Sequence, residues 1–145
     1  MEWVRKVCNI LEEKHLFNDL QHGTRFYQLV SCYCDKPFFT PGICKCIYLG
    51  AWDDEHFVQI LSMMTELSFA ANPESEDMAE NGRFLADETE GPEKYIMLLS
   101  CSFVENKPFD VQLPDDLDDR TKRVISYGLK ASAVIDEVCG EVQAL

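Results

Sequence analysis

The chain contains seven cysteines, and four of them form two Cys-x-Cys doublets: Cys32 with Cys34, and Cys44 with Cys46. Four thiolates would complete the tetrahedral shell of a structural zinc ion. The spacing argues against such a site, because a zinc-binding pair usually has about two to four residues between its ligands. With one intervening residue, the two side chains lie about 200° apart on a helix and on opposite faces of a strand. A doublet therefore chelates an ion only where its backbone is irregular.

The residues around both doublets predict regular helices instead. Apolar residues recur at helical intervals over 26–33, and Thr40 followed by Pro41 is typical of a helix N-cap with proline at the first helical position. We therefore expect the four cysteines to be small hydrophobic residues of the core, where free cysteine is commonly found. A zinc-binding structural module at the doublets is the alternative, and a redox-active thiol is a third hypothesis.

A second group that could do chemistry is His56, which directly follows Asp53, Asp54 and Glu55. A histidine beside three carboxylates could bind a metal ion or transfer a proton. However, acidic residues are favoured in the first turn of any helix because they face the positive end of the helix dipole. We therefore interpret the group as a solvated helix cap, with Asp53 or Asp54 starting a helix that continues to about Phe69.

The sequence contains no short motif of a known catalytic class. It lacks a glycine-rich phosphate loop, a G-x-S-x-G elbow, an H-E-x-x-H pair and a Rossmann fingerprint, and its three histidines are scattered. A cysteine nucleophile with a histidine base would become visible only in the fold. We therefore expect a non-enzymatic protein with no catalytic residue and no cofactor, zinc being the alternative.

Charge is unevenly distributed along the chain. The formal net charge is −13 from 13 basic and 26 acidic residues. Residues 1–71 carry nine acids and six bases, whereas residues 72–145 carry seventeen acids and seven bases. Such a surface repels nucleic-acid phosphates, so we expect no direct DNA or RNA binding and instead a basic protein partner. A more specific hypothesis is that the protein is a nucleic-acid mimic that inhibits a DNA- or RNA-handling protein. The alternative is that the negative charge only keeps the protein in solution.

The acidic residues are densest over 72–92, which has seven acids, one arginine, two glycines and two prolines. This composition predicts a long acidic loop, and a loop of that length inside a small domain is usually functional or disordered. The candidate partner-binding residues are the acids and the two apolar residues of this loop, Glu74, Glu76, Asp77, Glu80, Phe84 and Leu85.

Length and periodicity predict a mainly α fold: a single compact helical domain, 1–145, of about five helices. We expect helices at about 2–20, where Gly23 ends the first one, and at 24–34, 53–69 and 115–142. The stretches 41–49 and 92–103 also read as helices. The alternative is an α+β fold with strands near 43–49, 95–103 and 109–113, because short apolar runs suit either element.

The C-terminal helix has an apolar stripe whose centre is a packing seam of Val124, Gly128, Ala131 and Ile135. Glycine inside a helix costs about 1 kcal/mol relative to alanine, so Gly128 predicts that another backbone passes close to it. That backbone could belong to the same chain or to a second copy, so a homodimer is a further expectation.

An odd number of cysteines, charged residues in the first turn and the lack of a long apolar run predict free thiols in a reducing cytosol, with no membrane association. This composition is typical of small acidic helical proteins of bacteria and phages, which is a type rather than a family. We therefore predict a cytoplasmic protein-interaction domain that binds a basic partner.

Overall fold

The computed structural model describes residues 2–69 and 87–143, and this part of the chain is mainly helical. It contains six α-helices: α1 (Glu2–Glu13), α2 (Leu20–Tyr33), α3 (Pro41–Gly50), α4 (Asp54–Phe69), α6 (Glu93–Glu105) and α7 (Asp119–Gln143). The mainly α prediction is confirmed, with six helices in the described ranges rather than about five. The strand alternative is wrong, because 43–49 and 95–103 lie in helices and 109–113 has no regular structure. Among these helices, none is long and apolar enough to cross a membrane.

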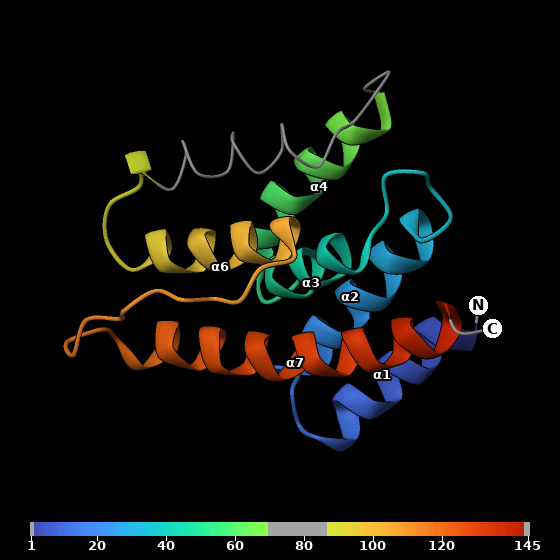
Figure 1. Cartoon of the computed structure of the whole chain (residues 1–145), viewed down its shortest axis with the longest axis horizontal. Helices are drawn as coiled ribbons and strands as arrows, with labels where there is room; N and C mark the ends of the chain where they lie inside the picture. Colours follow the sequence, from blue (N-terminus) through green and yellow to red (C-terminus); the bar gives the residue numbers. More distant parts are fainter. Residues whose placement is uncertain (1, 70–86, 144–145) are drawn as a thin grey trace.

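Helix α3 is the centre of the fold, and α2, α4, α6 and α7 all pack against it (Figure 1). It starts as predicted, because Pro41 occupies the first turn and the Thr40 side chain accepts a hydrogen bond from the Ile43 amide at 3.1 Å. Its buried residues include Ile43, Cys44, Lys45, Cys46, Ile47, Tyr48 and Leu49. Burial on all sides explains the continuous apolar run that made this stretch ambiguous in the sequence.

Helix α1 ends, and helix α2 begins, at earlier residues than the sequence predicted. Helix α1 ends in a Schellman motif, in which His15 adopts a left-handed conformation with φ 57° and the Leu16 amide donates to the Leu11 carbonyl at 2.9 Å. Asp19 then caps α2 by accepting from the His22 amide at 2.7 Å. The prediction that Gly23 ends the first helix is therefore wrong: Gly23 lies in the first turn of the second one.

Helices α6 and α7 lie side by side and run in the same direction, while the segment 106–118 returns along them to connect the end of α6 to the start of α7 (Figure 1). Asn106, in the left-handed conformation with φ 56°, ends α6 and turns the chain into this return segment. The starts of both helices consequently lie at the same end of the molecule.

The glycine that permits a close backbone approach is Gly42, not Gly128. A Cβ on Gly42 would lie 2.2 Å from the carbonyl oxygen of Phe103, so α3 and α6 touch through their backbones there. At Gly128 a Cβ would instead meet side chains, with Leu49 at 2.9 Å and Leu99 at 3.2 Å. The predicted seam is buried, but helices of the same chain fill it, so it no longer supports a homodimer.

Candidate functional site

The structure places the two cysteine doublets on regular helices. Cys44 and Cys46 on α3 are buried in the core, as predicted. Cys32, on the outer face of α2, is exposed, so the core prediction is wrong for this residue, whereas Cys34 at the end of α2 is half-buried and packs against the edge of the core. The error has a simple cause: α2 buries only one side, whereas α3 is covered all round.

The environment of the thiols favours packing over chemistry. Burial raises the pKa of Cys8 to about 11 and the pKa of Cys46 to about 12. Burial also raises the pKa of Cys44 well above its ordinary value. A cysteine nucleophile needs the thiolate, and burial keeps these three thiols protonated. Within the ranges 2–69 and 87–143, no group of three or more His, Cys, Asp or Glu side chains is arranged to bind a metal ion.

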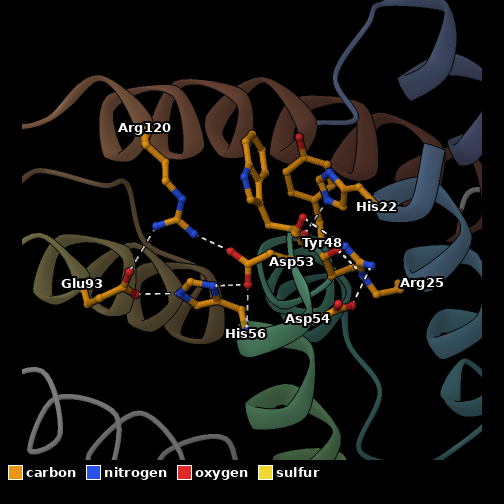
Figure 2. Close-up of polar contacts among 10 residues, drawn as sticks. His22, Arg25, Tyr48, Asp53, Asp54, His56, Glu93 and Arg120 are labelled. Atoms are coloured by element: carbon orange, nitrogen blue, oxygen red, sulfur yellow. Dashed lines mark hydrogen bonds and ion pairs between the residues drawn. The ribbon is translucent and has the colours of Figure 1, made fainter. Parts of the chain in front are cut away.

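All six predicted partner-binding residues lie outside the described part of the chain, so the structure does not test their role. They are Glu74, Glu76, Asp77, Glu80, Phe84 and Leu85. What the structure adds is a polar cluster beside the described flank of that acidic stretch. We call it the junction: the side chains of Asp53, His56, Glu93 and Arg120, which come from the starts of α4, α6 and α7 (Figure 2).

The His56 ring is the centre of the junction. Its Nδ1 lies 2.6 Å from Asp53 Oδ1, and its Nε2 lies 2.7 Å from Glu93 Oε2. Arg120 closes the ring of contacts by pairing with Asp53 and by placing a guanidinium nitrogen 3.5 Å from Glu93 Oε1 (Figure 2). Two carboxylates from different helices are thus joined by two cations.

This geometry fixes the charge of His56. An ionised carboxylate only accepts hydrogen bonds, so both ring nitrogens must donate, and a ring with two N–H groups is the imidazolium. Partial burial disfavours that charge, but hydrogen bonds to Glu93 and Asp53 outweigh it and raise the pKa of His56 above its ordinary value. Burial also opposes ionisation of Asp53, yet its bonds from His56 and Arg120 keep the pKa of this carboxyl below the usual range.

The junction also balances three helix dipoles. The positive ends of α4, α6 and α7 meet there, and Asp53 and Glu93 supply negative charge to those ends. Asp53 additionally accepts from the His56 amide at 2.9 Å, which confirms it as the predicted cap of α4. The prediction of a solvated cap is wrong, because the His56 side chain is only 13% exposed and is bound through both nitrogens.

Sequence reasoning missed two junction residues, Glu93 and Arg120. They are 37 and 67 residues from their partners in the cluster. No periodicity connects such distant positions, and only the parallel course of α6 and α7 brings them to one place. The available signal was indirect: Glu93 begins a helix after Pro92, and Arg120 is a cation in a first turn where acids are preferred.

A second polar cluster lies under the C-terminal end of α3. The fully buried His22 ring donates from Nε2 to the Tyr48 carbonyl at 2.9 Å (Figure 2). At Nδ1 the ring accepts from the Asn18 amide at 2.9 Å. Arg25 donates to the Ala51 carbonyl at 2.9 Å and the Trp52 carbonyl at 3.2 Å. These side chains satisfy carbonyls that the end of a helix leaves free.

The His22 ring is neutral. The Asn18 amide can only donate, so Nδ1 carries no proton. Burial among aromatic rings disfavours the charged form and lowers the pKa of His22 to about 4, although the bond to the Tyr48 carbonyl works in the other direction. This cluster is a structural support for α3 rather than a candidate for chemistry.

Two acidic segments lead into the helices that the junction joins, residues 87–93 into α6 and residues 114–119 into α7. Residues 87–93 and 114–119 contain four acids each and no lysine or arginine, and most of these carboxylates are exposed. We call these two segments the acidic end. Because the junction fixes the starts of α6 and α7 relative to each other, it also fixes how the acidic end is presented.

Comparison of the chain with models of protein families, with curated proteins and with solved structures gave no match. Its function must therefore be inferred from its own geometry and charge.

Proposed function

We propose that the protein is a non-enzymatic interaction domain whose acidic end binds a basic surface of a protein partner. The observation that carries the proposal is the concentration of exposed carboxylates over 87–93 and 114–119, without a lysine or arginine among them. Within the described part of the chain, no cation pairs with Glu88, Glu90, Asp115 or Asp116. Their charges are free to attract a partner.

The junction supports this proposal by giving the acidic end a fixed shape. Binding to a pre-arranged set of charges costs less conformational entropy than binding to a flexible segment, which must first become ordered. The predicted loop residues from Glu74 to Leu85 directly precede the acidic end in the chain, and they would extend the same negative surface.

The test is partner capture from a lysate of the source cells by an acidic-end variant, Glu88→Gln/Glu90→Gln/Asp115→Asn/Asp116→Asn. We expect the variant to lose most of the captured partner, and we expect wild-type capture to weaken steeply as salt is raised because exposed charges are screened. A matched control removes four exposed acids elsewhere, with Glu12→Gln/Glu13→Gln/Asp35→Asn/Glu137→Gln.

The two variants have the same net charge, so they separate location from total charge. Equal losses of partner in both variants would mean that only the overall field matters. Unchanged capture by the acidic-end variant would contradict the proposal.

A further inference from the structure

Exposed apolar side chains are concentrated on two helices. The described residues include five exposed large apolar side chains, and four of them belong to α2 and α4: Leu20, Tyr27, Val58 and Leu61. Leu20 is 85% exposed and Val58 is 65% exposed, whereas the fifth, Leu129, lies apart on α7. A soluble surface normally scatters such residues singly, so a concentration on neighbouring elements marks a binding surface.

Leu20 and Val58, the two most exposed of these residues, border a hollow of about 620 Å³ between the two helices. Leu20, Gln21 and Thr24 line it from α2, and Phe57 and Val58 line it from α4. The ion pair of Arg25 and Asp54, whose Nη1 and Oδ1 atoms are 3.1 Å apart, also lines the hollow. The hollow is therefore an open groove of mixed lining, in which Leu20, Phe57 and Val58 supply the apolar surface.

Helix α4 also carries an exposed apolar residue beyond the hollow. Phe57, Val58 and Leu61 follow the i, i+1, i+4 spacing of one helix face, while Ile60 and Met64 are buried on the side that packs against α3. One side of α4 is thus covered by the core, and beside it Phe57, Val58 and Leu61 form a short apolar strip among exposed polar residues.

The charge beside the groove is negative. Helix α4 carries three carboxylates, Asp54, Glu55 and Glu66, against the one cation His56, which is held in the junction, and Asp19 adds a carboxylate at the start of α2. Arg25 is the sole lysine or arginine in α2, and its guanidinium is already bound to the Ala51 and Trp52 carbonyls and to Asp54. Free cations of a partner would therefore complement the rim.

We propose that the groove between α2 and α4 binds an amphipathic helix of the protein partner, with its apolar face on Leu20 and Val58 and basic residues on its polar face. This inference rests on the proposed function, because it takes the same basic partner and adds a second, apolar contact. An amphipathic helix places apolar residues at i, i+3, i+4 and i+7 spacing into a groove formed by two helices, and apolar anchors rather than rim charges supply most of the binding energy.

The experiment is a titration of the ¹⁵N-labelled full chain with a synthetic amphipathic helix that has leucine on one face and lysine on the other. We expect backbone amide shifts over 20–28 and 54–65. Leu20→Gln/Val58→Gln should weaken binding about tenfold, because loss of two central apolar anchors costs more than loss of rim contacts. The control Leu129→Gln removes another exposed large apolar residue, outside the groove, and should leave affinity unchanged.

Further peptides and one hydrodynamic measurement separate the alternatives. Shifts confined to 114–119, or binding that survives the double variant, would overturn the groove assignment and leave the proposed function standing. Equal groove binding by a peptide with glutamate in place of lysine would overturn the basic-partner proposal itself. A dimer in sedimentation velocity that the double variant dissociates would overturn the inference and assign the groove to a second copy of the chain.

Discussion

The His22 cluster and the junction each hold a histidine in a network of polar contacts, but with opposite charge. His22 lies between a backbone carbonyl and a backbone amide within a cage of aromatic rings, and it is neutral. His56 lies between two carboxylates at the edge of the fold, and it is an imidazolium. The side chains and backbone groups in contact with the ring, rather than burial alone, therefore determine the charge.

This difference also separates two tasks. The His22 cluster closes the end of α3 inside the core, where a charge would be costly. The junction fastens three helix starts beside solvent, where charges can be paired and where the adjacent acidic end is available to a partner. Four predictions test this difference between the two histidines.

The largest expected effect is that of His22→Phe. Phenylalanine fills a similar volume but leaves the Tyr48 carbonyl and the Asn18 amide without their partner, so the free energy of unfolding at pH 7 should fall by about 3 kcal/mol. Urea denaturation measures this change. A loss of less than about 1 kcal/mol would show that the ring acts by packing alone.

Acid sensitivity comes next. The pKa of His22 in the folded chain is about 4, below its ordinary value of 6.5. Between these two pH values, the unfolded chain therefore binds a proton at His22 that the folded chain does not bind. Stability should therefore fall as pH decreases from 6.5 to 4, by about 3 kcal/mol in total from this group. The measurement is the difference in unfolding free energy between wild type and His22→Gln across this range. A constant difference would mean that His22 does not cause the acid loss.

His56 should show the opposite dependence. Its folded pKa is raised, so its contribution is fully present below pH 6.5 and is lost as pH rises through the folded pKa. We expect His56→Gln to cost about 1 kcal/mol at pH 6, because glutamine cannot donate to both carboxylates from one charged group, and less at higher pH. Denaturation of both proteins at several pH values tests this. A penalty that grows with pH would contradict the imidazolium assignment.

The smallest effect belongs to Arg120. Its guanidinium is half exposed, and exposed ion pairs contribute about 0.2 to 1 kcal/mol, so Arg120→Gln should cost a few tenths of a kcal/mol. The cost should shrink further in high salt. Arg5→Gln, which removes an exposed cation from α1, should have no measurable effect. An Arg120 penalty as large as that of His22→Phe would make the junction the main support of the fold.

Local signals in the sequence predicted most of the helices. Thr40 with Pro41 and Asp53 before α4 are chemical start signals, and both act as caps in the structure. The end of α1 was mispredicted because the left-handed position is occupied by His15, a residue type that gives no stop signal, while Gly23 stands inside the next helix.

Contacts between distant segments could not be predicted in the same way. The role expected of Gly128 belongs to Gly42, because a glycine in a sequence does not say whether a backbone or a side chain will fill the space beside it. His56 was identified as a candidate from its acidic neighbours, but Glu93 and Arg120 join it only through the return course of 106–118 (Figure 1).

The most direct test of the central claim, that a charged His56 joins the helix starts beneath the acidic end, is a pH titration of the histidine side chains by ¹H–¹⁵N NMR. His56 should titrate above its ordinary value of 6.5, with both ring nitrogens protonated at pH 6.5, while His22 should remain a neutral Nε2–H tautomer down to about pH 4. A neutral His56 ring at pH 6.5, or titration of both histidines at the same pH, would contradict the account.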